Sequence, residues 1–340
     1  ESDAIFIHLT LVPYLSAAKE LKTKPTQHSV KMLLESGIQP DILVCRTEHH
    51  LNSDIRKKIA RFCNVDKKSV IESIDAKSIY EVPLLMQKEG LDREVLKKLG
   101  LEDNTEIELK IWNSFLDKLQ NPKKEIIIAL VGKYIELKDS YKSISEALLH
   151  AGTNHDCKIN IKWIHAEAIN LSNVKELISD VDGVLVAPGF GDRGIEGKID
   201  TIQFVRENNI PFFGICLGMQ TCVIEFARNV LGYKDANSTE MKSNTKHPVI
   251  DLMNSQQEVT KKGGTMRLGS YSCELEKDSN SYNSYQKKDI NERHRHRFEF
   301  NNRYLSSFEK EGMIAARIVV YFLNFMTTIT NHKTILVYIL

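Results

Sequence analysis

Short apolar runs alternate with polar, amphipathic stretches along the first hundred residues of the chain. The apolar runs Ala4–Val12 and Asp41–Cys45 predict strands. The stretches Ser29–Ser36, Ser53–Cys63 and Ser78–Glu89 predict helices, because their apolar positions recur with a helical spacing. An alternation of this kind is typical of α/β folds.

A charged segment, Asp103–Lys124, separates this first series from a second one. It contains one amphipathic stretch, Glu108–Leu119, which predicts a helix. The helix should end at Asn121-Pro122, since the residue before a proline disfavours helical geometry. We interpret residues 103–124 as the connection between two domains.

The second series begins with a strand that is apolar almost throughout. We predict strands at Glu125–Val131, Lys158–Ile164, Gly183–Ala187 and Ile210–Gly214. A helix is expected around Ser143–Ala151, and Lys277–Lys288, rich in Ser, Asn and Tyr, is expected to be a surface loop. Near-continuous apolar strands suit a mostly parallel sheet covered on both faces, so we predict a doubly wound sheet.

Composition narrows the class of protein. The length of 340 residues allows about two domains. Lysine plus arginine (46) balance aspartate plus glutamate (45), which argues against nucleic acid as the main partner. Six cysteines without CxxC spacing predict neither a disulfide framework nor a zinc site, and they favour a cytoplasmic location. Because Glu1 follows neither an initiator Met nor a leader, we expect a fragment without a secretory signal.

Cys216 is the candidate nucleophile. It lies in the sequence Gly214-Ile-Cys-Leu-Gly218, between a predicted strand and a helix from about Met219 to Val230. This is the context of a nucleophile elbow, whose sharp turn needs neighbours without side-chain bulk. The helix N-terminus should lower the thiol pKa. The alternative is a buried, inert cysteine, which is what we expect of Cys222.

A second glycine-bearing turn, Pro188–Gly191, follows the strand that ends at Ala187. Acyl transfer needs two fixed donors for the tetrahedral oxyanion. We assign these donors to the N–H groups of Gly189 and Leu217. An ordinary loop between a strand and a helix is the alternative.

Several segments of the second series together resemble CTP synthase: GICLGMQ, the PGFG turn, Ala236–Glu240, Gly263–Gly269 and Glu292–Asn302. The resemblance implies a class I glutamine amidotransferase domain. It implies that glutamine contacts Gly189, Leu217, Gly218, Met219 and Gln220, with its α-ammonium on Glu240 and its α-carboxylate on Arg297. Arginine binds carboxylates with two parallel hydrogen bonds. In Arg293–Arg297 a strand would place three arginines on one face, although such a run is more often a solvated face or a phosphate patch.

The first hundred residues resemble the later part of the family's P-loop-like amidoligase (synthetase) domain, most clearly in His8–Val30 and Gly37–Arg46. The resemblance implies that UTP, or CTP as an inhibitor, contacts Lys22, Thr23, Lys24, Pro25, Thr26, Gln27 and Lys58. It places the adenine of ATP at Ile74, Asp75 and Ala76. We interpret Lys22–Gln27 as a proline-stiffened loop that offers donors to a triphosphate, with a lysine-rich surface turn as the alternative.

In CTP synthases, ATP phosphorylates O4 of UTP, and ammonia from glutamine then displaces the phosphate. The resemblance implies Mg²⁺, held by ligands outside this chain, GTP as an activator, a homotetramer, and no nucleic acid or membrane partner. It divides the chain into residues 1–102 (synthetase), 103–124 (linker), 125–316 (amidotransferase) and a divergent tail, 317–340.

Two motifs of the family do not occur in this sequence. These are the phosphate-binding glycine loop and the His-Pro-Glu triplet that supplies the general base; His332 is followed by Lys333 and Thr334. The expectation is therefore an incomplete, weakly active form. A non-catalytic nucleotide- and glutamine-binding subunit is the alternative, and another class I amidotransferase synthetase is a third reading that Lys22–Gln27 disfavours.

Overall fold

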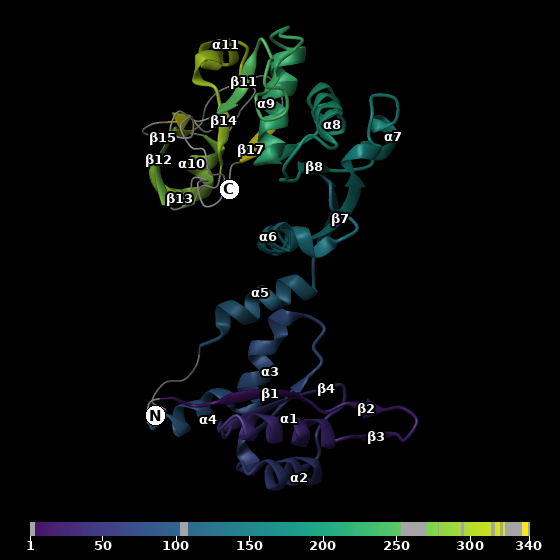
Figure 1. The fold of residues 1–340 in the computed structure, drawn as a ribbon, viewed down its shortest axis with the longest axis vertical. Helices are drawn as coiled ribbons and strands as arrows, with labels where there is room; N and C mark the ends of the chain where they lie inside the picture. Colours follow the sequence, from purple (N-terminus) through teal and green to yellow (C-terminus); the bar gives the residue numbers. More distant parts are fainter. Residues whose placement is uncertain are drawn as a thin grey trace. The chain divides into compact units, whose positions relative to one another are not determined.

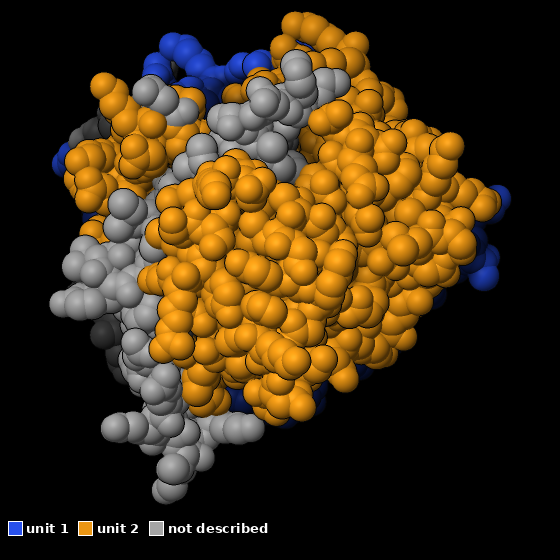
Figure 2. Space-filling model, turned by 90° about the horizontal axis from the view of Figure 1, so that it is seen from above, with its two compact units in different colours: residues 1–120 blue, residues 121–340 orange. Residues whose placement is uncertain are grey.

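The computed structural model describes residues 4–102, 108–252, 270–277, 279–293, 296–313, 317–319, 322–323 and 335–338 (Figure 1). The chain divides into two compact units, residues 1–120 and 121–340, which Figure 2 colours separately. We describe each unit by itself.

Unit 1 is built on a three-stranded parallel sheet of order β1-β4-β5. These strands span Ile7–Leu11, Ile42–Thr47 and Val70–Ile74, and a small antiparallel pair, β2 (Tyr14–Leu15) and β3 (Glu20–Leu21), follows β1. The helices are α1 (Lys24–Glu35), α2 (Ser53–Cys63), α3 (Val82–Glu89), α4 (Leu91–Lys98) and α5 (Lys110–Gln120), with short 3₁₀ turns at Lys67–Ser69 and Ile79–Glu81. The predicted α/β alternation is confirmed.

Local signals fix the ends of these helices. Asn52 caps α2, because its side-chain oxygen accepts the N–H groups of Asp54 (3.1 Å) and Ile55 (2.9 Å). Asn64 ends the same helix in the left-handed conformation. The apolar faces of α1 and α2 bury Val30 and Ile59 against the sheet. Burial of these faces, rather than helix propensity alone, holds the unit together.

Helix α5 packs within unit 1. The indole N–H of Trp112 donates to the carbonyl oxygen of Tyr80 at 2.8 Å, and the rings of Tyr80 and Phe115 meet at 5.2 Å. The helix predicted at Glu108–Leu119 is confirmed, and its aromatic face ties it to the first unit.

Unit 2 contains a five-stranded, all-parallel sheet of order β17-β9-β8-β6-β7. In that order the strands span Ile335–Tyr338, Phe212–Ile215, Gly183–Val186, Lys124–Gly132 and Cys157–His165. The helices of this part are α6 (Lys142–Asn154), α7 (Val174–Ile178), α8 (Ile195–Glu207) and α9 (Leu217–Asn229), with 3₁₀ turns at Lys138–Tyr141 and Ala166–Ala168.

Alternate residues of β6 face different helices. Ala129 and Val131 belong to the core formed with α7, α8 and α9, whereas Leu130 belongs to the core that contains Ile144 of α6. Because successive side chains of a strand point to opposite faces, the sheet is covered on both sides. The predicted doubly wound arrangement is confirmed.

Two smaller sheets complete the described part of unit 2. One has the order β10-β11-β14 and the other β13-β12-β15-β16. Their strands are β10 (Asn237–Ser238), β11 (Pro248–Leu252), β12 (Ser270–Leu275), β13 (Asp289–Arg293), β14 (Phe298–Phe300), β15 (Arg317–Val319) and β16 (Phe322–Leu323). Two short helices, α10 (Asn280–Tyr285) and α11 (Leu305–Lys310), and a 3₁₀ turn at Asn302–Tyr304 accompany them.

Two sequence predictions fail in this region. The loop predicted at Lys277–Lys288 contains α10, because Ser279 accepts the N–H of Tyr282 and caps the helix. The single strand predicted at Arg293–Arg297 is also wrong, since β13 ends at Arg293 and β14 begins at Phe298. His296 is buried between them, while residues 294 and 295 lie outside the described part of the chain.

The tail, 317–340, contributes strands to two of these sheets. Its strand β17 pairs in parallel with β9, with Tyr338 opposite Ile215. Among the described residues, no helix is both long and apolar enough to cross a membrane.

Candidate functional site

The strand-to-helix turn after β9 holds Cys216 in a strained backbone conformation, with φ 54° and ψ −106°. Such geometry is rare for a residue with a side chain and is typical of a nucleophile elbow. The flanking glycines are required sterically. A Cβ on Gly214 would lie 2.7 Å from backbone atoms of Gly218, and one on Gly218 would lie 2.2 Å from the carbonyl oxygen of Val186.

The two N–H groups assigned above to the oxyanion act on the pKa of the Cys216 thiol. Burial raises its pKa, whereas the N–H groups of Leu217 and Gly189 and the positive charge of Lys198 oppose that rise. The pKa of the Cys216 thiol is therefore raised overall. The expectation that the helix N-terminus lowers this pKa is wrong for the chain without substrate. The elbow is more buried than the sequence indicated, and desolvation outweighs the donors.

Two buried lysines hold the turn that follows β8. Lys133, next to the end of β6, donates from Nζ to the carbonyl oxygens of Phe190 (2.7 Å) and Gly191 (2.8 Å). Lys198 of α8 donates from Nζ to the carbonyl oxygen of Ala187 at 2.8 Å. The two lysines are 2% and 0% exposed. Within the described ranges, neither ammonium forms an ion pair with a carboxylate.

Sequence reasoning missed both lysines, although the chain carries a signal for each. Lys133 directly follows an apolar strand, and polar residues at the carboxyl ends of parallel strands commonly line a site. Lys198 shares a helix face with Ile195 and Ile202, which are three and four residues away. A lysine on an apolar helix face indicates a special role, because Lys is almost never fully buried without a partner.

The predicted contacts for the amino-acid end of glutamine lie near one another. Partial burial raises the pKa of the Glu240 carboxyl, while the nearby charges of Lys133 and Arg297 oppose the rise. The Nε of Arg297 is buried and has no hydrogen-bond partner among the described residues. An unpartnered, buried guanidinium donor fits a site for an anion.

Gln220 lies on the first turn of α9 with Leu217, Gly218 and Met219, and these four residues are buried. Its side-chain Nε2 donates to the carbonyl oxygen of Phe298 at 3.0 Å. Gln220 therefore fixes the segment next to Arg297. The predicted segment Gly263–Gly269 and His332 lie outside the described residues.

The predicted nucleotide loop of unit 1 is largely helical. Lys24, Pro25, Thr26 and Gln27 form the first turn of α1, and Thr23 is its N-cap residue. The loop interpretation was wrong because proline is well tolerated at the start of a helix.

Both threonines of this segment and Lys22 are already engaged. Thr26 is fully buried and donates to the carbonyl oxygen of Leu11 at 3.0 Å, while Gln27 donates to the hydroxyl of Thr23 at 3.0 Å. Lys22 pairs with Glu20. The hydrogen bond and charge of Lys22, and more weakly the charge of Lys58, lower the pKa of Glu20, so both lysines act on the same carboxylate.

Of the predicted adenine contacts, Ile74 is the last residue of β5, and Asp75 and Ala76 follow it at the carboxyl edge of the sheet. Arg46 donates from Nε to Asp75 at 3.2 Å. The carboxyl edge of a parallel sheet is the usual place for nucleotides.

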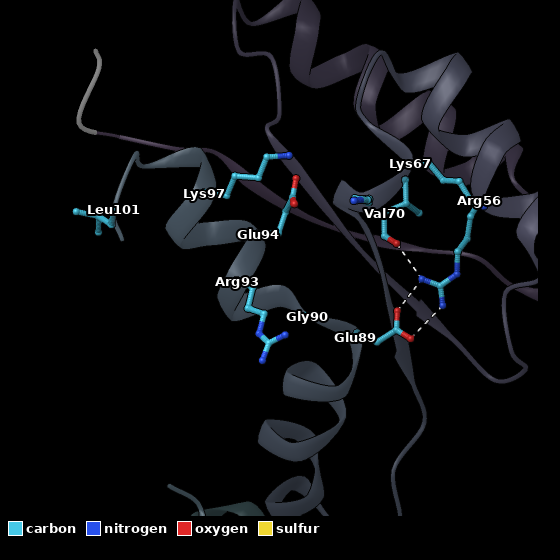
Figure 3. A pocket seen from close by; sticks show the side chains of 10 residues that line it. Arg56, Lys67, Val70, Glu89, Gly90, Arg93, Glu94, Lys97 and Leu101 are labelled. Carbon is cyan, nitrogen blue, oxygen red and sulfur yellow. Dashed lines mark hydrogen bonds and ion pairs between the residues drawn. The ribbon is translucent and has the colours of Figure 1, made fainter. Parts of the chain in front are cut away.

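Unit 1 also has a cavity of about 840 Å³ lined by residues of α2, α3 and α4 and the turn before β5 (Figure 3). On its wall Arg56 donates to both carboxylate oxygens of Glu89, at 2.6 and 3.1 Å, and to the carbonyl oxygen of Val70. None of the predicted nucleotide contacts lines this cavity. Four further cationic side chains line the cavity beside Arg56. We assign the cavity no ligand.

Comparisons with known proteins follow the division into two units. The family model described as CTP synthase N-terminus matches residues 1–101, and the class I glutamine amidotransferase model matches residues 136–331. A CTP synthase of Cytophaga hutchinsonii is 64% identical over 93% of this chain and 59% of its own length. That of Clostridium acetobutylicum is 54% identical over 92% of this chain and 58% of its own length. The chain thus spans little more than half the length of the curated relatives it matches.

A solved structure, the glutaminase domain of Trypanosoma brucei CTPS with bound acivicin, is also similar. Its TM-score is 0.58 and its identity 31%, over 62% of this chain and 84% of that one. The similarity supports the fold of unit 2 by an independent route.

Proposed function

Because this chain belongs to the class I glutamine amidotransferase family and carries a CTP synthase N-terminal domain, we propose that unit 2 is the glutaminase of a CTP synthase. The observation that carries the proposal is the Cys216 elbow. A strained cysteine at a helix N-terminus, whose thiol pKa is lowered by the backbone N–H groups of Leu217 and Gly189 against the effect of burial, is suited to acyl transfer.

In the proposed reaction, the Cys216 thiolate attacks the side-chain amide carbon of L-glutamine. The carbonyl electron pair moves to oxygen, and the N–H groups of Gly189 and Leu217 donate hydrogen bonds to the resulting oxyanion. The amide nitrogen takes up a proton, equivalent to the one that the thiol gave up, as the C–N bond breaks. Ammonia leaves and a thioester remains. Water then hydrolyses the thioester to glutamate and restores the thiol.

Substrate selection rests on opposite charges. Glu240 accepts the α-ammonium, and the free Nε of Arg297, with the rest of its guanidinium, receives the α-carboxylate. Gly218, Met219 and Gln220 form the wall next to the nucleophile. Bound substrate would satisfy a donor that is otherwise buried without a partner.

For unit 1 we propose a synthetase role, supported by the resemblance and by relatives named CTP synthase. UTP, or CTP as an inhibitor, would lie near Lys22, Lys58 and the N-terminus of α1, where the helix dipole favours phosphate. ATP would lie near Ile74, Asp75 and Ala76. GTP activation and a homotetramer belong to the same proposal.

The described residues contain no group of three or more His, Cys, Asp or Glu side chains that could hold a metal. The resemblance implies Mg²⁺ with ATP, and no step of the proposal is assigned to the ion.

The test of the glutaminase proposal is labelling by a glutamine-derived chloroketone, with peptide mass mapping of all six cysteines. We expect one adduct, on Cys216, that L-glutamine suppresses and D-glutamine does not. Cys216→Ser should abolish it. The matched variant Cys222→Ala, which removes a cysteine buried in the core, should leave it intact. Absence of a Cys216 adduct, or no protection by L-glutamine, would favour a non-catalytic binding subunit.

A further inference from the structure

The turn that offers Gly189 to the nucleophile has little side-chain anchorage of its own. Phe190, its one large apolar residue, is 70% exposed. Gly189 and Gly191 contribute no side chain. The conformation of this turn must therefore be set through backbone carbonyl groups. Two in the turn and that of Ala187, directly before it, accept hydrogen bonds from the two buried lysines described above.

We propose that Lys133 and Lys198 are positioning residues that clamp the Pro188–Gly191 turn from both ends, so that the N–H of Gly189 stays directed at Cys216. The inference rests on the proposed glutaminase function and adds two residues to it. Neither lysine needs to touch the substrate in this role.

The placement of the hydrogen bonds supports a clamp. Lys198 holds the carbonyl of Ala187, two residues before Gly189, and Lys133 holds the carbonyls of the two residues after it. The stem of Lys133 also passes alongside Gly189, where a Cβ would lie 3.7 Å from its Cδ. Gly189 is thus fixed on three sides, while its N–H lowers the pKa of the Cys216 thiol.

The base of Lys133 is itself fixed. Its backbone N–H donates to the hydroxyl of Tyr141 at 3.1 Å, and Gly132 leaves room for that ring, since a Cβ there would lie 2.6 Å from the same hydroxyl. A long side chain can hold a turn accurately only if its own origin is rigid.

The cost of the arrangement argues against a purely structural role. Burial lowers the pKa of Lys198 to about 7, which means that the fold disfavours its charged form. A methionine would fill the same space without a buried ammonium. The hydrogen bonds to the turn are what lysine provides and methionine cannot.

The experiment compares two reagents on Cys216. Iodoacetamide alkylates the sulfur by direct displacement and forms no oxyanion, whereas a glutamine-derived chloroketone passes through a tetrahedral adduct that does. Both react with the thiolate, so the ratio of their rate constants cancels any change in thiol pKa. We would measure this ratio, by mass spectrometry, for the unchanged chain, Lys133→Met, Lys198→Met and the exposed control Lys175→Met.

We expect each buried-lysine variant to lower the chloroketone-to-iodoacetamide ratio by roughly 10²-fold, at the lower end of the loss caused by removing one oxyanion donor. The control should keep the ratio of the unchanged chain. Ratios unchanged in both buried-lysine variants overturn the clamp. So does an equal fall of both rates, because that indicates loss of the site rather than loss of alignment.

A stability measurement on the same variants separates alignment from folding. Lys198→Met should lower the ratio without lowering the free energy of unfolding, a combination that a merely structural lysine would not give. If the unchanged chain shows no glutamine-protected labelling at all, the glutaminase proposal fails, and that outcome is distinct from failure of the clamp.

Discussion

Arg56 in unit 1 and Lys198 in unit 2 are both inward-facing cations, yet their surroundings differ. Arg56 forms ion pairs with Glu89 at 2.6 Å and Glu72 at 3.3 Å, and Glu72 is almost fully buried. Lys198 is completely buried, and in the part of the chain that the structure describes its ammonium donates only to the backbone carbonyl of Ala187. The charge of Arg56 is balanced by carboxylates of its own unit. The burial of the Lys198 charge, in contrast, is not explained by a gain in folding stability.

The same contrast extends to the two candidate binding regions. In unit 1 Lys22 is paired with Glu20, and the hydroxyl of Thr26 is used internally. In unit 2 the Nε of Arg297 has no partner within the described ranges. A buried polar group without a partner marks the place where a ligand completes the structure. This difference makes the glutamine site the better defined of the two.

The largest effect should come from breaking the paired cation. Arg56→Met leaves the carboxylates of Glu72 and Glu89 without their partner, and removal of one member of a buried pair costs about 3–5 kcal/mol. Trp112 lies in unit 1 and Trp163 in unit 2, so Trp163→Phe gives a fluorescence signal for unit 1 alone in denaturant unfolding. Lys57→Met, on the exposed face of the same helix, is the control and should change little.

Unit 1 should also lose stability in acid. Although burial raises the pKa of Glu89, hydrogen bonds from Arg56 and from the backbone of Glu72 outweigh it and leave the pKa below 4.5. A carboxyl with a lower pKa in the folded state contributes its full stabilisation above 4.5 and loses it as the pH falls through the folded value. The loss of unfolding free energy caused by Arg56→Met should therefore shrink as the pH falls below 4.5. A loss that stayed constant over this pH range would contradict the ion-pair account.

The second effect should have the opposite sign. Lys198 has a pKa of about 7 in the folded chain against 10.5 when unfolded, so the unfolded chain binds more protons between these values and stability rises with pH. Lys198→Met removes the buried charge and should stabilise unit 2 most at pH 7 and below. With about 1.4 kcal/mol per pKa unit, the gain should shrink by roughly 2–3 kcal/mol between pH 7 and pH 9.

Denaturant unfolding at pH 7 and pH 9 measures the stability gained by Lys198→Met. A Trp112→Phe background leaves Trp163 as the single tryptophan, so its fluorescence reports on unit 2. The control Lys175→Met should show no such pH dependence. A gain of equal size at both pH values would mean that the ammonium of Lys198 is not buried in the folded chain.

The third effect should appear in binding and not in stability. Arg297→Met removes a donor that has no internal partner, so unfolding should be nearly unchanged. Loss of a hydrogen bond to a charged group corresponds to about 1.5–3 kcal/mol, or roughly a ten- to hundredfold weaker affinity for L-glutamine. Calorimetric titration measures it, with the exposed Arg303→Met as control. Unchanged affinity would remove Arg297 from the site.

The smallest effect tests the paired lysine of unit 1. Glu20→Gln releases Lys22 next to Lys58, and about a two- to fivefold gain in UTP affinity is expected, as for an exposed charge pair. Fluorescence titration with UTP measures the gain, and it should decrease with added salt. Weaker binding of UTP by this variant would argue against a phosphate site at these lysines.

Local patterns carried the parts of the fold that were predicted correctly. The apolar strand at Ile126–Val131 predicted a parallel sheet, because a strand buried on both faces is apolar at nearly every position. The spacing of Gly214, Cys216 and Gly218 predicted the elbow, because the residues that must lack a side chain for the sharp turn lie within five positions of one another. Such features need no knowledge of distant contacts.

Other parts depend on contacts between distant segments. Lys198 reaches Ala187 from the next helix, and Lys133 reaches Phe190 from another strand, so neither hydrogen bond is visible along the chain. Pro25 was read as part of a loop, although proline at a helix start is equally consistent with the sequence. Tertiary packing decided between the two.

The most direct test of the glutamine site is a crystal structure of the chain after reaction with the glutamine-derived chloroketone. We predict a bond from Sγ of Cys216, the adduct oxygen about 2.7–3.1 Å from the nitrogens of Gly189 and Leu217, the carboxylate on Arg297 and the ammonium on Glu240. An adduct on another cysteine, or an adduct oxygen turned away from Gly189 and Leu217, would contradict the account.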